Sequence, residues 1–484
     1  MPKGLEYKWI VAMVAIFGLF MELLDATIVN VAIPSLQREF SAETTTIEWV
    51  VTGYLLSLAV FIPVSGWAGD RFGTKRTFLF ALTVFTAASL ACAFAWSIGA
   101  LIVFRVLQGV GAGMLTPVGT TMVFRAFPPA ERSKASGVMV VPTTVAPASG
   151  PVLGGFLIDY ISWHWIFLVN VPVGIIGIFV AARWLKEQKE GDPGRFDVTG
   201  FLLASGGMAS LLYALAEAGP HGFDDSRVIL FGLLGLAMLV AFVVVELRTA
   251  EPMIDIRLFT DRLFATSNAV QFVAMTGFAA SLFILPIFLQ VERKLDAFES
   301  GLATFPMALG VMAAAQPTSR IYPHVGPRRL MMAGILIATL TAFGFAWMDL
   351  GTNIWLIRLL MFVRGIGFGL MLIPLQAATF ATITPHMTGR ASSLFSSSRM
   401  VAQSLGVAII ATALTTLLTN NDAIQGSATV GAVDAYQEAF IVAGLMSLLA
   451  LPVAFLIRDR DAAGTMLPRD EEAGAEREKT PAAV

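Results

Sequence analysis

Long apolar stretches, separated by short clusters of charged residues, recur along the whole 484-residue chain. Many of them reach about 18 residues or more, and a helix of about 20 residues crosses the hydrocarbon core of a membrane because each residue adds about 1.5 Å. The pattern therefore predicts fourteen membrane-spanning helices. They are expected near residues 9–35, 46–68, 77–96, 99–124, 135–160, 164–184, 197–217, 227–247, 264–290, 300–319, 329–349, 353–378, 391–418 and 437–458.

Composition supports the same interpretation. The chain is 56% hydrophobic and only 14% charged, whereas a soluble domain carries about 25% charged residues. We therefore expect an all-α polytopic membrane protein. The sequence offers no polar catalytic cluster, so we do not expect an enzyme. Its net charge of -2 gives no reason to expect a nucleic-acid partner.

Residues that could bind a metal are few and scattered. Cys92 is the one cysteine, which excludes an intramolecular disulfide and a cysteine-based metal site. The histidines fall in predicted loops without the spacing of metal ligands; they are His164, His221, His324 and His386. We therefore expect neither a metal nor another cofactor.

Basic residues indicate how the predicted helices are oriented. Most of the 32 lysines and arginines fall on the side that holds the N-terminus. The loops of the opposite side hold only Arg38, Arg227, Arg293 and Lys294. Because cytoplasmic loops of membrane proteins carry the excess of lysine and arginine, we expect both termini in the cytoplasm and an even number of helices.

An internal repeat divides the chain into two halves. The stretch RVLQGVGAGM at 105–114 matches MFVRGIGFGL at 361–370. Parallel repeats of this kind are typical of secondary transporters, whose binding site lies between the repeats. The predicted parts are six-helix bundles at residues 1–190 and 261–458, two inserted helices with their linkers at 191–260, and a disordered cytoplasmic tail at 459–484.

The stretch GWAGDRFGTKR at residues 66–76 lies at a predicted loop between two helices. Gly66 and Gly73 allow close helix contact and a tight turn. Asp70 stands at a helix end, where it can accept backbone N–H groups from the start of a neighbouring helix. The basic residues of the loop can set topology and hold lipid phosphates; they are Arg71, Lys75 and Arg76.

Two acidic residues, Glu22 and Asp25, interrupt the first apolar stretch. A charged side chain inside a membrane is costly and normally faces a cavity or a partner. Counted from the outer ends of their helices, Asp25 lies about 15 Å deep and Arg105 about 9 Å, so the long arginine side chain can reach the carboxylate. The pair is either purely structural or a proton-coupling site, in which Asp25 alternately binds a proton and pairs with Arg105.

Other polar residues inside predicted helices are candidates for a central cavity. Glu22, one helical turn deeper than Asp25, is a second protonation site, an attraction for cationic substrates, or the partner of a neighbouring polar group. Arg364 stands where the first half has Gln108. It either faces the cavity or has a structural role, snorkelling or bonding backbone carbonyls. Asn30 is the third candidate for the cavity.

Four stretches together resemble the major facilitator superfamily, and within it the fourteen-helix drug:proton antiporter branch. LDATIVNVAIP at 24–34 resembles the first-helix motif of that branch. Residues 66–76 resemble the signature loop of the whole superfamily.

The other two stretches resemble motifs of the fourth and fifth helices. RVLQGVGAG at 105–113, which includes Gln108 and Gly109, resembles the fourth-helix motif, whose arginine is tied to proton transfer. APASGPVLGG at 146–155 resembles the fifth-helix antiporter motif. Its matching residues are Gly150, Pro151, Gly154 and Gly155.

The resemblance implies a major facilitator fold of two six-helix bundles with two additional helices. It implies a proton-coupled antiporter that exports amphiphilic or cationic drugs from a bacterium across its inner membrane by alternating access. The implied partners are small amphiphilic substrates, protons and membrane lipids, and nothing requires more than a monomer. The 66–76 loop would stabilise one closed state near the start of the thirteenth helix, and residues 150–155 would shape the fifth helix at the bundle interface.

Two other functions stay open at this point. The chain could instead export an endogenous lipid, a siderophore or an antibiotic that the cell itself makes. It could also be a non-transporting membrane receptor or scaffold. A receptor would not need Asp25 and Arg105 together.

Overall fold

The computed structural model describes residues 6–189, 194–249, 252–425 and 428–467, and these residues form helices and loops without a strand. Fourteen helical segments are long and apolar enough to cross a membrane, which confirms the predicted number. The first half contains α1 (Tyr7–Phe40), α2 (Thr44–Ile47), α3 (Trp49–Phe72), α4 (Thr74–Ala93), α5 (Ile98–Ala126), η1 (Pro129–Glu131), α6 (Arg132–Tyr160), α7 (Trp165–Leu168) and α8 (Asn170–Trp184).

The inserted segment and the second half also consist of helices joined by loops. The insertion contains α9 (Val198–His221), α10 (Ser226–Arg248) and η2 (Ile256–Thr260). The second half contains α11 (Arg262–Ile287), η3 (Phe288–Glu292), α12 (Ala297–Thr304), α13 (Pro306–Val325), α14 (Pro327–Phe345), α15 (Ile354–Thr379), η4 (Pro385–Met387), α16 (Thr388–Gln425), α17 (Ala428–Leu448), α18 (Ala450–Phe455) and η5 (Asp459–Thr465).

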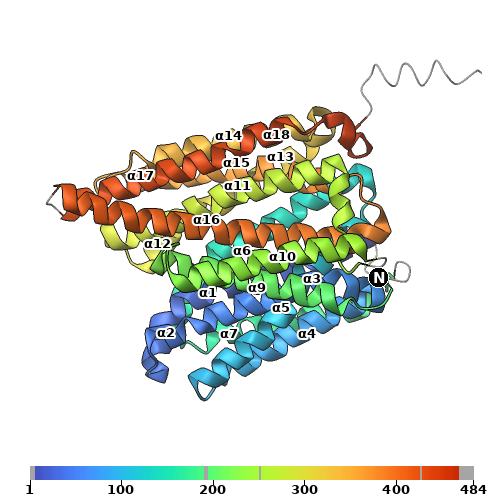
Figure 1. The fold of residues 1–484 in the computed structure, drawn as a ribbon, viewed down its shortest axis with the longest axis horizontal. Coiled ribbons are helices and arrows are strands. Elements are labelled where there is room, and N and C mark those ends of the chain that lie inside the picture. The colour runs from blue at the N-terminus through green and yellow to red at the C-terminus, as the bar shows by residue number, and fades with distance from the viewer. Residues whose placement is uncertain (1–5, 190–193, 250–251, 426–427, 468–484) are drawn as a thin grey trace, which may run out of the picture.

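The two halves lie side by side as separate bundles (Figure 1). Within the first, α5 packs on α3 and α4 while α1 packs on α6; within the second, α15 packs on α13 and α14 while α11 packs on α16. Across the boundary, α3 packs on α16 and α6 packs on α13. The inserted helices α9 and α10 cover one side of this boundary, where α9 contacts both α3 and α16.

Close helix packing depends on small residues at the contacts. A side chain on Gly109 of α5 would meet the carbonyl oxygen of Tyr54 of α3 at 2.6 Å, and one on Gly334 of α14 would meet the carbonyl oxygen of Gly367 of α15 at 2.5 Å. Apolar side chains gain little by leaving lipid for a helix interface, so close backbone approach supplies much of the attraction between membrane helices.

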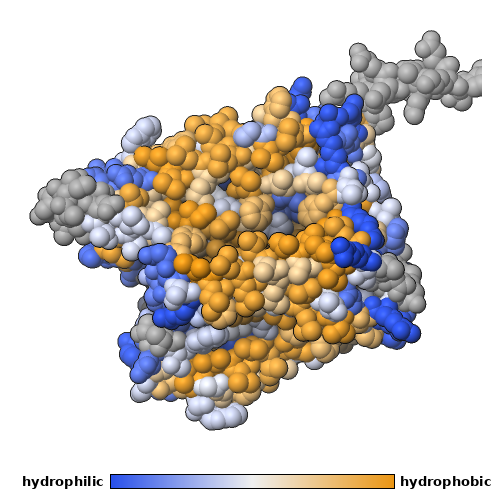
Figure 2. Space-filling view, in the orientation of Figure 1, coloured by the Kyte–Doolittle hydropathy of each residue, from blue (hydrophilic) through white to orange (hydrophobic). Residues whose placement is uncertain are grey.

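The surface matches a membrane environment. An apolar band covers the middle of the molecule, and polar residues gather at its two ends (Figure 2). Helix α10 exposes several leucines, such as Leu230, Leu233 and Leu236. We call the end where α1 begins and where α3 and α5 finish the N-terminal face.

The predicted tail departs from expectation directly after the last membrane helix. Residues Asp459–Thr465 form the 3-10 helix η5 instead of a disordered chain. The hydroxyl groups of Tyr322 and Thr465 are 2.7 Å apart, and the amide of Leu467 donates to the carbonyl of Pro323. Charge and the lack of apolar periodicity suggested disorder, but these polar groups are satisfied by the second bundle. Residues 468–484 of the predicted tail lie outside the described residues.

In each half, an acidic residue that follows the last membrane helix caps the start of the third membrane helix. The Glu187 carboxylate accepts the backbone amide of Lys75 at 3.0 Å, and the Asp459 carboxylate accepts that of Arg328 at 3.0 Å. Both amides lie in the first turn of a helix, α4 or α14, where backbone donors lack helical partners. The parallel repeat therefore extends to the caps of its helices.

Candidate functional site

Asp25 lies at the centre of a polar network inside the first bundle, and its side chain is fully buried. One Nη of Arg105 on α5 donates to Asp25 Oδ2 at 2.5 Å. The side-chain amides of Gln108 and of Asn170 on α8 each donate to Oδ1 at 2.9 Å. The carboxylate therefore joins three helices and is compensated by one cation and two amides.

Arg105 extends this network to α3. Its Nε donates to the carbonyl of Val50 at 3.1 Å, and its guanidinium lies 4.0 Å from the centre of the Tyr54 ring. The same Nη that meets Asp25 also donates to Gln108 at 2.7 Å. Four helices of the first bundle, α1, α3, α5 and α8, therefore converge on a single buried ion pair.

The sequence predicted the partners Asp25 and Arg105 but not Asn170. Asn170 is buried, and its amide also donates to the hydroxyl of Ser89 on α4 at 3.2 Å. The available signal was a lone amide inside the apolar stretch 165–184. An uncharged polar residue carries a smaller penalty in a membrane than a charged one, so that signal was weaker than those of Asp25 and Arg105.

Glu22 lies at the boundary between the bundles, and the hydroxyl of Tyr54, whose ring stacks on Arg105, donates to its backbone carbonyl at 3.4 Å. The hydroxyl of Thr116 on α5 donates to Glu22 Oε2 at 2.5 Å. Arg399 on α16 of the second bundle interacts with the same carboxylate electrostatically. Glu22 is buried, and its neighbours come from both bundles, so it occupies a position that any relative movement of the bundles would alter.

The 66–76 loop lies against the start of α16, the thirteenth membrane helix. Asp70 is buried, and Arg125 at the end of α5 donates to its Oδ1 at 2.8 Å. Arg125 also donates to the carbonyl of Pro385, just before α16. A side chain on Gly66 would meet the carbonyl oxygen of Gly389 at 2.7 Å, so glycine permits this close contact.

The other loop residues connect within the first bundle. Lys75 Nζ donates to the carbonyls of Ala182 and Leu185 at the end of α8, at 2.7 and 2.8 Å. Arg76 pairs with Glu187 at 3.7 Å. Gly73 adopts φ +93°, a conformation that favours glycine, and Arg71 is exposed.

Further contacts close the boundary at the N-terminal face. Ser133 of α6 donates to the carbonyl of Ser319 of α13 at 3.2 Å, and Ser392 of α16 donates to the carbonyl of Pro117 of α5 at 2.8 Å. Arg132 donates to the carbonyl of Phe380, whose ring stacks on Phe124. These cross-bundle partners were not predicted, because neither half shows its contacts with the other in its own sequence.

The fifth-helix motif positions α6 between the two bundles. Side chains on Gly150 and Gly154 would meet Thr27 and Ile28 of α1, so these glycines hold α6 close to α1. Pro151 lies on another side, near Gly301 of α12. The fourth motif residue, Gly155, faces open space, where a side chain would meet nothing within 4 Å.

The remaining cavity candidates do not gather around Glu22. Arg364 is 1% exposed inside the second bundle, where it donates to the carbonyl of Ala338 at 3.1 Å and lies 5.4 Å from the Phe278 ring. This geometry matches the carbonyl-bonded alternative for Arg364 and not the cavity-facing one. Asn30 is exposed, and its amide donates to Ala26 of its own helix.

Side chains of the types that bind metals are scattered through the described residues. Within the described part of the chain, no three His, Cys, Asp or Glu side chains are placed to hold a metal ion. Cys92 is buried, with its sulfur 3.7 Å from the side-chain oxygen of Gln108.

Comparisons with known proteins agree on one family. A family model described as Major Facilitator Superfamily matches residues 15–407. The chain is 35% identical over 406 residues to the multidrug resistance protein B homolog of Mycobacterium tuberculosis strain H37Rv, covering 83% of this chain and 75% of that protein. It is 34% identical over 409 residues to the putative multidrug resistance protein MdtD of Pectobacterium atrosepticum, covering 84% and 87%.

A solved structure shares the fold. The crystal structure of the human organic anion transporter MFSD10 (TETRAN) aligns with a TM-score of 0.67 over 93% of this chain and 100% of that one. At 14% identity this likeness concerns the fold alone.

Proposed function

Because this chain belongs to the major facilitator superfamily, and is thus a membrane transporter rather than an enzyme, we propose that it exports amphiphilic or cationic drugs in exchange for protons by alternating access. The names of its bacterial relatives support export of drugs from a bacterium across the inner membrane. The excess of basic residues at the N-terminal face supports a cytoplasmic position for that face.

The observation that carries the proposal is the buried pair of Asp25 and Arg105. Ionisable side chains inside membrane spans are rare and typically mark proton or substrate pathways. Protonation of Asp25 would remove the counter-charge of Arg105, and a buried pair that loses one partner costs about 3–5 kcal/mol. That exceeds the 1–3 kcal/mol typical of coupling between sites, so a single proton can shift the balance between conformations.

Helix α3 offers a route from the ion pair to the boundary between the bundles. Arg105 holds the Val50 carbonyl near the start of α3. The other end of the same helix carries Gly66 and Asp70, which lie against the start of α16. Loss of the ion pair would release α3 from Arg105 and weaken its hold on α16. Protonation would thereby favour opening at the N-terminal face.

In this proposal, the Glu22 carboxylate attracts cationic substrates. Its carboxylate lies at the boundary between the bundles, and Arg399 supplies a counter-charge from the second bundle. A lipophilic cation that reaches this position would pair with the Glu22 carboxylate directly and take over the charge compensation that Arg399 supplies from a distance. Movement of α16 would then follow substrate binding.

The test is export of a lipophilic cation dye from proteoliposomes under an imposed pH gradient. The proposal predicts that wild type exports dye and that Asp25→Asn binds dye without exporting it. Asp224→Asn is the matched control, because Asp224 is exposed in the loop between α9 and α10, and it should export like wild type.

Two results would contradict the proposal in different ways. Equal export by wild type and Asp25→Asn would remove Asp25 as the coupling site and make Glu22 the next candidate. A wild type that moves no dye while the gradient holds would replace drug export by export of an endogenous compound.

A further inference from the structure

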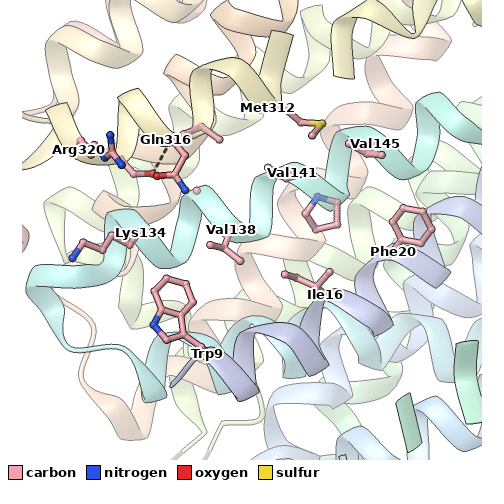
Figure 3. Close-up of a pocket in the computed structure, with 14 residues that line it drawn as sticks. Trp9, Ile16, Phe20, Lys134, Val138, Val141, Val145, Met312, Gln316 and Arg320 are labelled. Carbon is pink, nitrogen blue, oxygen red and sulfur yellow. Dashed lines mark hydrogen bonds between the residues drawn. The ribbon is translucent and has the colours of Figure 1, made fainter. Parts of the chain in front are cut away.

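A groove of about 820 Å³ runs along α6 between α1 and α13. Figure 3 shows Lys134 and Arg320 together at one end of it, and the apolar side chains of Phe20, Val141 and Met312 further along. Of the described residues that line the groove, two are basic and none is acidic. One end is therefore suited to an anion and the rest to hydrocarbon.

The groove opens on the outer surface of the molecule and not on the boundary around Glu22. Phe20 and Glu22 are two residues apart in α1, which places them about 200° apart around the helix. The lining side chains come from α1, α6 and α13. Met312 is 47% exposed and the Lys134 side chain 55% exposed, so the groove is accessible from the surrounding membrane.

Its dimensions and position match one leaflet of a bilayer. Lys134 and Arg320 lie near the helix ends of the N-terminal face, at the start of α6 and near the end of α13. The lining of α6 continues from Lys134 to Val145, a rise of eleven residue steps or about 16 Å. Half of a hydrocarbon core of about 30 Å has the same depth. Trp9 stands at the charged end, and tryptophan is enriched at the membrane interface.

The charged end stays positive despite nearby acids. Glu131 is shared between Lys8 at 2.6 Å and Lys134 at 3.7 Å. The pair with Lys134 is exposed, and such pairs contribute little. The Lys134 side chain can therefore leave Glu131 and pair with a phosphate at little cost in free energy.

From these features we infer that an anionic phospholipid of the leaflet at the N-terminal face binds in this groove. Its phosphate would meet Lys134 and Arg320, and an acyl chain would lie along α6. Basic pockets between membrane helices recognise anionic headgroups in this way. The groove walls belong to both bundles and lie beside the Ser133–Ser319 contact, so the bound lipid holds the N-terminal face closed. This inference does not depend on which substrate is exported.

Native mass spectrometry of the purified protein tests the inference. The protein is mixed in detergent with phosphatidylglycerol or with phosphatidylcholine of the same acyl chains. Wild type should retain one phosphatidylglycerol in preference to phosphatidylcholine. Lys134→Gln with Arg320→Gln should lower this preference about tenfold or more, since each basic residue near an anionic lipid contributes about 1 kcal/mol.

Two further variants separate a built site from general attraction to the surface. Lys189→Gln with Arg329→Gln removes two exposed charges of the same face outside the groove, and should leave the preference unchanged. Met312→Trp narrows the apolar part while both charges remain, and should also reduce retention. Because Met312, Lys134 and Arg320 are exposed, these variants should fold, which gel filtration checks.

Three results would overturn the inference. Equal retention of the two lipids by wild type would show only annular lipid. An equal loss of the preference for phosphatidylglycerol in Lys189→Gln with Arg329→Gln would show that the attraction is non-specific electrostatics. Displacement of phosphatidylglycerol by inorganic phosphate alone, or by the exported dye, would assign the groove to a free anion or to substrate.

Discussion

At the scale of residues, charge inside the membrane gave the clearest information. Asp25 and Arg105 stood out in the sequence because each interrupts an apolar stretch within reach of the long arginine side chain, and the structure pairs them. Asn170 and Thr116, which complete the two carboxylate environments, are uncharged. Such residues are tolerated in many membrane helices, so their partners emerge only from the packing.

Replacement of Glu22 by glutamine should separate cationic from neutral substrates. Glu22→Gln removes the charge at the boundary of the bundles but leaves an acceptor for the Thr116 hydroxyl. We expect kcat/KM for a cationic dye to fall about tenfold, as for the loss of a hydrogen bond to a charged group, and neutral drugs to be exported as before. Proteoliposome export assays with both kinds of substrate measure this. Glu438→Gln, at an exposed acid, is the matched control, and an equal loss for both substrates would contradict the assignment.

At the scale of helices, apolar length predicted number and placement well. All fourteen segments were predicted. Each is a continuous apolar stretch, because a chain in lipid must satisfy its backbone hydrogen bonds within its own helix. The prediction of a disordered tail was wrong for residues 459–467, where polar groups form hydrogen bonds with the second bundle instead of with water. The single span predicted at 300–319 is confirmed, but the hydrophobic pattern did not show that it is divided into α12 and α13, with α13 beginning at Pro306.

A larger side chain at Gly66 should keep the two bundles apart at the N-terminal face. In Gly66→Leu the new side chain meets the Gly389 carbonyl and Ser393, and overpacking of this kind costs about 1–3 kcal/mol. Closure can be followed by a disulfide between Gly137→Cys and Ser319→Cys, because a Cβ on Gly137 would lie 3.5 Å from that of Ser319. We expect the disulfide to form at least about fivefold more slowly than without the leucine.

Gly99→Leu is the control for this experiment. A side chain on Gly99 would meet nothing within 4 Å, so the disulfide should form at the original rate. Equal rates in Gly66→Leu and Gly99→Leu would show that the α3–α16 contact does not control closure.

At the scale of the whole molecule, the repeat predicted two bundles but not their conformation. The proposed alternating access requires the same sequence to support both closed and open arrangements of the N-terminal face, so only the contacts between bundles would distinguish them. In this structure the contacts of Arg125, Ser133, Ser392 and Arg132 with the second bundle close that face while Asp25 and Arg105 are paired.

The proposed orientation can be checked by labelling with a membrane-impermeant maleimide in intact cells. Lys189→Cys, beyond α8 at the N-terminal face, should be protected, whereas Asp224→Cys, in the loop between α9 and α10, should react. Cys92 is buried and should contribute little background. The reverse pattern would invert the topology and with it the direction of transport.

The central claim is that the proton state of Asp25 controls closure at the N-terminal face. The most direct measurement is the pH dependence of the disulfide between Gly137→Cys and Ser319→Cys, made in a Cys92→Ser background with Asp25 intact or changed to asparagine. The asparagine variant supplies the baseline, because thiol chemistry itself slows as pH falls. If the account holds, lowering the pH far enough to protonate Asp25 will slow the disulfide more with Asp25 than with asparagine. The asparagine variant should be slow throughout. Identical pH profiles in the two backgrounds would contradict the claim.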